Sequence, residues 1–481
     1  MRHTLVISDV HLCEGVPGDD LWMRWRQKPY FPDDEFRALV DWVLAQVAPG
    51  DSVELVFNGD LFDFDAGRVM DGEVRFEDLP RSEGVSVDLM GRILDDHPGY
   101  VDAMGRLLAG GHAVVFVSGN HDPQLGFDGV RRMLRERLSA AAGHPRHGER
   151  VRFRGWFHQT ADGVHIEHGN QYDTYCAFRY PMTPFVPPER GRDREIHPTV
   201  GSLAFRYLGA RLGYMNPHVD DSFLLGLREY IQHWVKHYLF TERSLAMTWL
   251  KGAFHIVSSV ALQSDPGSPD RLHRDVGIAA RETGADPELV ERHHRLFAPP
   301  AEESLLRVVR EFWVDRMVLG ALSGLAVLTP IVLRSRRAVG VAVGLPLLFA
   351  AYEMAVPSPG LDSNYVSIAG RAEAIAEIYG CRGVVFGHTH VPYGRWKDGV
   401  FYGNSGTWSS AYRDLECKVP VDARGKPVIW LRRGDGPLEG GLHRWDGEAL
   451  VADFSRVSPV DPTEHGHSRA PLGSDETAGV A

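Results

Sequence analysis

In the segment Thr4-Leu-Val-Ile-Ser-Asp-Val-His11, near the N-terminus, a short apolar run ends directly at Asp9 and His11. The run Leu5-Val-Ile7 has the length and the residue types of a buried strand. Phe36 to Val47 follows with the periodicity of an amphipathic helix. Strand-like runs that alternate with helical segments are typical of an α/β layer architecture. The sequence therefore predicts an α/β fold in which strands end at chemically useful side chains.

The same arrangement, an apolar run followed at once by Asp, Asn or His, returns along the chain. The polar motifs are Asp9-Val-His11, Gly59-Asp60-Leu-Phe-Asp63, Gly119-Asn120-His121-Asp122, His168-Gly169 and Gly387-His388-Thr-His390. Strands are expected before the later motifs at Val53–Phe57, Ala113–Val117, Val164–Glu167 and Gly383–Phe386, and afterwards at Val400–Tyr402, Val428–Leu431 and Gly441–Val451. Ligands of open α/β sheets bind beyond the carboxyl ends of the strands. We therefore expect the motifs to converge on one site.

The residue types of these motifs suit metal ions. Imidazole and carboxylate groups bind Zn, Fe and Mn, and no thiolate is needed. Asp9 and His11, like His388 and His390, are separated by one residue. In an extended backbone this spacing puts both side chains of a pair on the same face. The pattern therefore predicts a metal site whose ligands come from distant segments of the chain.

The ordered set of motifs resembles the calcineurin-like metallophosphoesterase superfamily, whose pattern is DxH…GDxxD…GNH[DE]…H…GHxH. The resemblance covers about residues 1–175 and 379–415. It implies a sandwich of two mixed β-sheets flanked by helices. We expect residues 1–173 and 379–456 to form the catalytic core, residues 174–378 to form a large helical insertion or cap, and residues 457–481 to be a disordered tail.

The resemblance also implies two bound divalent ions. One ion would have Asp9, His11 and His390 as ligands, the other Asn120, His168 and His388, and Asp60 would bridge them. Manganese is the expected metal, with iron, zinc and magnesium as alternatives. Such a metal pair activates water and clamps a phosphate for in-line attack. His121 would stabilise or protonate the leaving oxygen, and Asp63 would orient His121.

Other histidines compete for these roles. His165 lies three residues before His168, inside the strand-like run and without a following glycine, so His168 is the expected ligand. His3, His112 and His158 are expected to be surface or structural residues. The metal set therefore uses only a minority of the 23 histidines.

The sequence thus predicts a metal-dependent phosphohydrolase acting on a phosphomonoester, phosphodiester or pyrophosphate bond of a lipid-linked or nucleotide-type substrate. Protein Ser/Thr phosphatases continue the second motif with Arg-Gly and end the third with Glu, whereas this chain has Phe64-Asp65 and Asp122. A phosphoprotein substrate is therefore disfavoured. The layout is loosely similar to the UDP-2,3-diacylglucosamine diphosphatase group, although some of those enzymes have Arg where this chain has His121.

Two other functions compete with this prediction. A nuclease of the same superfamily is disfavoured by the formal net charge of -12, because nucleic-acid binding requires basic surfaces. A non-catalytic scaffold on the same fold is disfavoured because the ligand set is complete. The four widely spaced cysteines, and an N-terminus without an apolar leader, predict a cytoplasmic protein with reduced thiols.

An apolar stretch at residues 317–356 predicts a membrane hairpin. Met317 to Leu333 is uncharged, Arg334-Ser-Arg-Arg337 follows, and Ala338 to Tyr352 is again uncharged. Each half is close to the roughly 20 apolar residues of a spanning helix, so we expect a peripheral or monotopic contact with the inner face of a membrane. The alternative is a buried hairpin in a soluble cap. Residues 223–262, which mix aromatic and basic side chains, predict either an interfacial helix or one packed on the core.

Overall fold

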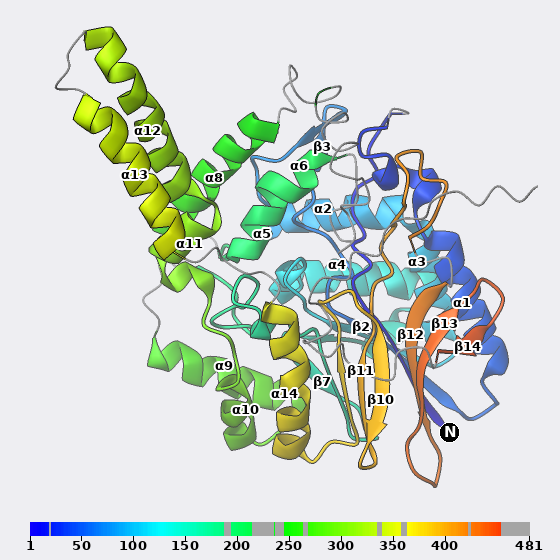
Figure 1. Ribbon diagram of the computed structural model, residues 1–481. Helices are drawn as coiled ribbons and strands as arrows, with labels where there is room; N and C mark the ends of the chain where they lie inside the picture. The colour runs from blue at the N-terminus through cyan, green and yellow to red at the C-terminus, as the bar shows by residue number, and fades with distance from the viewer. Residues whose placement is uncertain are drawn as a thin grey trace, which may run out of the picture.

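The computed structural model describes residues 1–18, 21–186, 194–213, 235, 245–262, 268–333, 339–356, 363–421 and 425–453. Two mixed β-sheets pack face to face, and helices cover their outer faces (Figure 1). This arrangement confirms the predicted α/β sandwich. The tail predicted at residues 457–481 lies outside the described residues.

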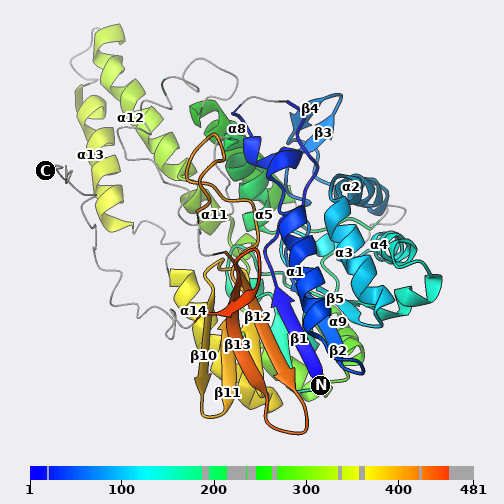
Figure 2. The same ribbon diagram turned by 90° about the vertical axis from the view of Figure 1, so that its right-hand side faces the viewer.

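The first sheet has seven strands in the order β14-β13-β12-β1-β2-β5-β6. Its parallel strands are β1 (Arg2–Ile7), β2 (Ser52–Asn58), β5 (Ala113–Val117) and β6 (Val151–Arg154). Its antiparallel strands are β12 (Lys426–Arg433), β13 (Glu439–Trp445) and β14 (Leu450–Ala452). Because β12 pairs with β1, the C-terminal strands complete the sheet that the N-terminal strand begins (Figure 2).

The second sheet has five strands in the order β10-β11-β9-β8-β7. They are β7 (Phe157–Gln159), β8 (Val164–Glu167), β9 (Gly383–Phe386), β10 (Tyr393–Lys397) and β11 (Val400–Asn404). β8 and β9 are parallel neighbours, with Val164 opposite Gly383. This long-range pairing brings the fourth and fifth motifs to the same end of the sheet. A separate hairpin consists of β3 (Arg68–Met70) and β4 (Glu73–Arg75).

The two sheets meet through a core of mostly β-branched side chains. Val6, Val56 and Val115 of the first sheet face Val164, Ile166 and Val385 of the second, and all are fully buried. Strands buried on both faces read as continuous apolar runs, which is why these strands are recognisable in the sequence. Fully burying each such side chain contributes about 1.5–3 kcal/mol to the fold.

Helices cover both outer faces of the sandwich. The first sheet is covered by α1 (Asp33–Gln46), α2 (Glu83–Asp96), α3 (Pro98–Ala109) and α4 (Asp128–Ala141), and the second by α9 (Pro269–Thr283), α10 (Pro287–His294) and α14 (Ser363–Tyr379). α1 buries Phe36, Leu39, Val40 and Val43, which is the spacing of an amphipathic helix. Short 3-10 turns occupy Arg24–Arg26, Lys28–Tyr30, Pro123–Gly126, Pro145–Arg150, Asn170–Tyr172 and Ala301–Glu303.

A helical cap lies over one end of the sandwich, at the top of Figure 1. It contains α5 (Val200–Ala204), the π-helix η6 (Phe205–Gly209), α6 (Ala210–Leu212), α8 (Leu245–Leu262) and α11 (Leu305–Glu311). Leu203 and Tyr207 pack with Ile256 and Val308 in a small core of their own. The domain boundaries at residues 173 and 379 stay a prediction, since α9, α10 and α14 lie within 174–378 but pack against the second sheet.

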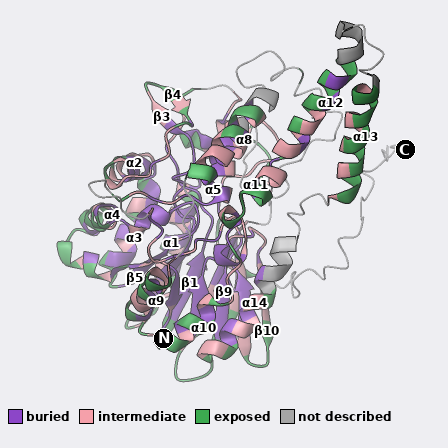
Figure 3. Cartoon of the chain, turned by 90° about the vertical axis from the view of Figure 1, so that its left-hand side faces the viewer, coloured by how far each residue is buried: buried purple, intermediate pink, exposed green. Residues whose placement is uncertain are grey.

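Two further helices, α12 (Val314–Leu333) and α13 (Val339–Ala355), form a hairpin that projects from the cap (Figures 1 and 3). Its connecting residues 334–338, which include the predicted Arg-rich turn, lie outside the described residues. In the part of the chain that the structure describes, no helix combines the length and the apolar character needed to cross a bilayer.

The expected strands and helices can be compared with these elements. β5, β8 and β9 have the predicted bounds, and α1 and β1 differ from prediction by a few residues at their ends. The single strand expected at Gly441–Val451 is wrong, because β13 and β14 form a hairpin there. The turn between them contains Gly447 at φ 102°, and the Asp446 carboxylate accepts hydrogen bonds from Glu448 N and Ala449 N.

Arg206 ties the cap to the core. Its guanidinium is fully buried and donates hydrogen bonds to backbone carbonyls of the loop on the core side, namely those of Asp65, Ala66, Arg75, Phe76 and Asp78. Burial lowers the pKa of Arg206 to about 10, which still leaves the side chain charged at neutral pH. One side chain from the π-helix thus serves as the donor for a run of backbone carbonyls.

We predict that Arg206→Ala lowers the free energy of unfolding by about 3–5 kcal/mol, because buried carbonyls lose their donor. The matched control is Arg211→Ala, which removes an ion pair with the exposed Glu77 at 3.1 Å and a contact with the Phe76 ring at 5.6 Å, and should cost no more than about 1–2 kcal/mol. Denaturant unfolding followed by circular dichroism measures both changes. Equal unfolding midpoints for the two variants would show that Arg206 does not hold the cap.

A second prediction concerns Asp275 of α9, whose carboxylate accepts hydrogen bonds from Met182 N and the Thr183 hydroxyl. Burial raises the pKa of Asp275 to about 7, despite these two hydrogen bonds. A raised pKa means that the carboxyl group favours the fold below pH about 4, and that this stability is lost as pH rises through about 7. Asp275→Asn should remove this loss. The free energy of unfolding of the variant, relative to that of the wild type, should therefore rise by up to about 4 kcal/mol between pH 4 and pH 8.

Denaturant midpoints at several pH values measure this difference directly. The same pH dependence in both proteins would contradict the assignment, since the asparagine side chain of the variant cannot ionise.

Candidate metal centre

The five polar motifs gather where β1, β2, β5, β8 and β9 end. Each candidate ligand follows one of these strands within a few residues. The strands belong to two sheets, yet their carboxyl ends meet under the cap. Convergence of distant segments, which the sequence predicted, is therefore what the fold produces.

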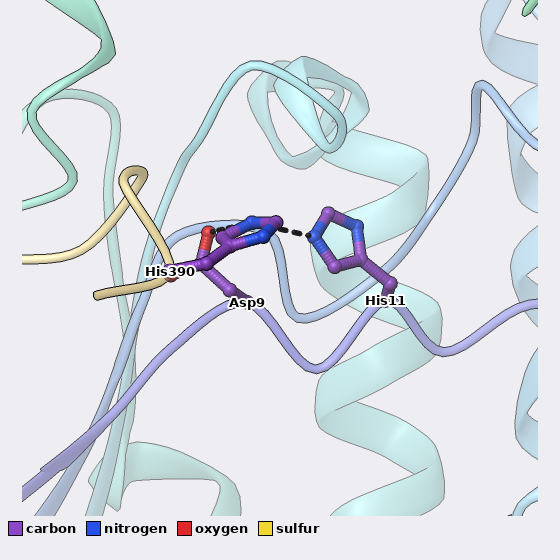
Figure 4. Close-up of side chains that lie close together, drawn as sticks. All are labelled: Asp9, His11 and His390. Carbon is purple, nitrogen blue, oxygen red and sulfur yellow. Dashed lines mark hydrogen bonds and ion pairs between the residues drawn. The ribbon is translucent and has the colours of Figure 1, made fainter. Parts of the chain in front are cut away.

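Asp9, His11 and His390 form the first group of candidate ligands (Figure 4). Asp9 Oδ1 lies 3.1 Å from His390 Nε2, which in turn lies 3.5 Å from His11 Nε2. Ligand atoms bound at about 2.1 Å to one divalent ion lie about 3.0–3.4 Å apart. The three donor atoms therefore have the chemistry and the spacing of a metal-binding group.

His168 is the centre of the second group. Its Nε2 lies 3.1 Å from Asp60 Oδ2, 3.2 Å from Asn120 Oδ1 and 4.0 Å from Asp9 Oδ1. The other ring nitrogen, Nδ1, lies 2.9 Å from the carbonyl oxygen of Asn58. A proton on Nδ1 donated to this carbonyl leaves the lone pair of Nε2 directed at the carboxylates, as metal-binding histidines require.

Asp60 is shared between the groups. Its donor atoms lie within 4.8 Å of those of Asp9 and His168, and also within 4.8 Å of those of His11 and His121. Burial opposes the charge of Asp60, but the nearby His168 and His121 outweigh it and hold the pKa of Asp60 below its usual range. This is the position that a bridging carboxylate would take.

The charges of this site favour cations. Burial disfavours a protonated His168, yet the charges of Asp60 and Asp9 raise the pKa of His168 to about 9. Buried carboxylates are stable only when they are paired or coordinated to a metal. The buried carboxylates therefore need cationic partners, which either protons on the imidazoles or divalent ions can supply.

His388 lies at the edge of this constellation. Its backbone N–H donates to Asp9 Oδ2 at 3.1 Å, and its ring centre lies 5.2 Å from that of His168. Its Nε2, however, lies 3.1 Å from Asp173 Oδ2, in a group completed by Cys176. Asp173 was not predicted from the sequence, although its position five residues after His168 could have drawn attention to it.

The local backbone is left-handed at five of the seven candidate ligands. Among the described residues, ten non-glycine residues have positive φ, and five of them are Asp9, His11, Asp60, His388 and His390. The extended backbone predicted for the two closely spaced pairs is therefore wrong. Such a conformation costs a non-glycine residue on the order of 1–3 kcal/mol and is typical of functional sites. The pairs still converge, because the left-handed turns direct their side chains inward.

Two motif glycines are required by close approach. A Cβ at Gly59, where φ is 81°, would overlap the ring of His168, and a Cβ at Gly119 would overlap the carboxylate of Asp60. Any larger residue would push a candidate ligand out of place. These glycines belong to the motifs for a steric reason.

His121 completes a further candidate metal-binding group with His11 and Asp60, and it also contacts two carboxylates. Its Nδ1 is 3.3 Å from Asp63 Oδ1 and 3.4 Å from Asp65 Oδ2, and its backbone N–H donates to Asp60 Oδ1 at 2.8 Å. Burial opposes protonation, but the charge of Asp60 and the hydrogen bond and charge of Asp63 raise the pKa of His121 to about 10. His121 is thus placed to hold a proton next to the site.

Asp65 is a contact of His121 that was not predicted from the sequence, where Phe64-Asp65 served only to separate this chain from the protein phosphatases. Burial raises the pKa of Asp65 to about 7. Asp122, in contrast, has a structural role, because it accepts hydrogen bonds from the backbone N–H groups of Gly119 and Leu61 at 2.7 and 3.0 Å. It thereby joins the second and third motifs.

Comparison with known families agrees with this geometry. Residues 2–197 match the family model described as calcineurin-like phosphoesterase. The chain carries a calcineurin-like phosphoesterase domain. A comparison with curated proteins found no match.

The calcineurin-like domain identifies the chain as a metal-dependent phosphohydrolase. The matched residues include the motifs from Asp9 to His168, but they end before His388 and His390. The pairing of β8 with β9, and the hydrogen bond from His388 N to Asp9 Oδ2, bring those two histidines to the matched domain. The identity of the metals and the roles of single residues stay predictions.

We predict that His168→Ala and His165→Ala separate metal binding from packing. Both imidazoles are fully buried, three residues apart, so both variants should be less stable than the wild type. Only His168 faces Asp60 and Asn120, so only His168→Ala should lose the rise in melting temperature that Mn²⁺ gives the wild type. Metal content measured by mass spectrometry should fall in the same variant. An unchanged response to Mn²⁺ in His168→Ala would exclude it as a ligand.

Proposed function

We propose that this protein is a dinuclear-metal phosphoesterase. The observation that carries the proposal is the meeting of Asp9, Asp60, His168 and His390, which come from four distant strand ends, within a few ångströms of one another. Asp9, His11 and His390 are the proposed ligands of one ion, Asn120, His168 and His388 those of the other, and Asp60 is the proposed bridge. When bound, two divalent ions, proposed to be Mn²⁺, polarise a phosphoryl group and provide a nucleophile from water.

The proposed role of His121 is to protonate the leaving oxygen. Its ring lies 5.0 Å from the ring of His11, so it borders the first metal group. The charge of Asp60, followed by the contacts with Asp63 and Asp65, raises the pKa of His121, and the two latter carboxylates are proposed to orient the ring. A general acid in this position contributes about 10²–10⁴-fold to the rate.

The proposed substrate is a lipid-linked phosphoester or pyrophosphate. Phe205 of the π-helix packs edge-to-face on His121 with ring centres 4.7 Å apart, and Ser202 of α5 donates to the carbonyl of Asn120 at 3.1 Å. The cap therefore contributes an apolar ring directly beside the proposed acid. A further hollow beside His11 is lined by Trp25, Phe31 and Ser409, among other residues. Apolar and polar walls together suit a substrate with a phosphate and an apolar portion.

The proposed location is the cytoplasmic face of a membrane. All four cysteines are free, as expected in a reducing compartment. The membrane part of this proposal depends on the hairpin α12–α13 and on what covers its apolar surface.

We predict that Asp60→Ala and His121→Ala both abolish most hydrolysis of a chromogenic phosphoester in the presence of Mn²⁺, for different reasons. Asp60→Ala should lose bound metal, because both groups share this carboxylate. His121→Ala should keep its metal and lose about 10²–10⁴-fold in kcat, because only proton transfer is removed. The control is His273→Ala, an exposed histidine of α9. Rates near that of the wild type in either site variant would refute the proposed roles.

A further inference from the structure

The hairpin formed by α12 and α13 exposes an unusual amount of apolar surface. Leu325 on α12 and Leu347 on α13 are each 64% exposed, and Met354 is 90% exposed. Figure 3 shows the hairpin mostly in the colours of exposed and intermediate residues, and projecting away from the buried sandwich. Exposed apolar side chains that are gathered in one place on a protein surface mark a site of interaction.

The exposed surface surrounds the hairpin instead of lying on one side of it. Over residues 314–328, where the burial of α12 is described, the buried residues are Arg316, Ser323 and Ala326, and at 100° per residue they form a stripe only about 80° wide. The exposed residues of the same range, 318 to 328, cover about 220° of the helix by the same arithmetic. Among its described residues, α13 has no buried side chain at all.

This distribution decides between the partners that could cover the hairpin. A second copy of the chain, or any folded protein, would contact one face and leave the others in water. A helix that is apolar on all sides is otherwise found only in a large core or in lipid. Lipid acyl chains surround an inserted hairpin on all sides, so they can cover the whole of its exposed apolar surface.

A charged and aromatic collar closes the base of the hairpin. Arg316 Nε lies 2.8 Å from Glu353 Oε1, and the Tyr352 hydroxyl donates to Asp315. The Arg316 guanidinium also lies 5.9 Å from the ring centre of Trp313, which is 52% exposed. Aromatic and charged residues collect in this way at the headgroup level of membranes. Beyond the collar, Met317 to Leu333 contains no charged residue.

The cap continues this apolar surface next to the collar. Phe254 and Leu250 of α8 are 70% and 48% exposed, and the neighbouring Lys251 is exposed as well. Trp249 of the same helix donates to the sulfur of Met317 at 3.0 Å, which fixes α8 against the hairpin. Exposed apolar and basic side chains on one helix are typical of an interfacial face.

We propose that the α12–α13 hairpin immerses in a lipid bilayer and that its collar lies at the headgroups. Immersion of this kind needs no helix that crosses the bilayer. It would place the cap next to the membrane surface, together with the candidate site that Phe205 and His121 border. The inference deepens the proposed membrane location, but it does not rest on the proposed hydrolysis, since the residues that carry it lie outside the candidate metal centre.

The test is co-sedimentation of the full chain with vesicles of phosphatidylcholine and phosphatidylglycerol in a 3:1 ratio. The variant is Leu347→Glu with Leu348→Glu, at two adjacent exposed positions of α13. The matched control is Val419→Glu with Val451→Glu, since these side chains are 51% and 52% exposed but lie far from the hairpin in sequence and fold. We expect the wild type and the control to sediment with vesicles, and the bound fraction of the hairpin variant to fall at least tenfold.

Two further measurements keep the result unambiguous. Circular dichroism melting and Mn²⁺-dependent hydrolysis of a soluble chromogenic phosphoester should be unchanged in the hairpin variant, because its substitutions lie outside the core and the site. Wild-type protein that stays in the supernatant, or a hairpin variant that sediments like the wild type, would overturn the proposal. If the wild type is a dimer that does not bind vesicles, and the hairpin variant is a monomer, the result would overturn the proposal and would show that a second copy of the chain covers the hairpin. Hydrolysis is read separately, so loss of activity alone bears only on the proposed function.

Discussion

Buried negative charge at the ends of two parallel strands is the constraint on which the rest of the site depends. Asp9 and Asp60 are almost completely shielded from water, and each lies 3.1 Å from an imidazole nitrogen, that of His390 and that of His168 respectively. Carboxylates survive such burial only with cationic partners or metal ions. The left-handed backbone at these residues and the steric need for Gly59 and Gly119 both follow from packing the two carboxylates so close together.

The sandwich makes this concentration of charge possible. β1 and β2 deliver the carboxylates from one sheet, and β8 and β9 deliver the imidazoles from the other. Because the two sheets share a dense core of Val and Ile side chains, their strand ends cannot move independently. The cap then closes the site from above, with Arg206 holding its π-helix to the core loop and Phe205 reaching His121. A chain that carries a calcineurin-like phosphoesterase domain thus combines a candidate metal centre with a cap that extends into an apolar hairpin.

The sequence predicted the strands best where both faces of a strand are buried. β5, β8 and β9 are short uninterrupted apolar runs, so their bounds could be read directly. The sequence predicted strand bounds and backbone conformation less well where they depend on turns. β13 and β14 were expected to be one strand because the intervening Asp446-Gly447 turn is short, and the left-handed conformation of Asp9 and His11 leaves no mark in the pattern of residue types. Asp65 and Asp173 were missed as contacts of His121 and His388 for a related reason, since an isolated carboxylate in a loop looks the same whether or not it faces a site.

By itself, the sequence determined the class of fold and the chemistry of the centre, because short apolar runs that stop at Asp, Asn and His fix both the strands and the groups at their ends. Only the tertiary structure decided which of these groups meet. Val164 pairs with Gly383, although the whole cap lies between them in the sequence, and no local sequence pattern predicts that these two strands are neighbours. Tertiary structure also decided that the apolar hairpin stands exposed instead of buried, since burial depends on what surrounds a helix and not on its composition.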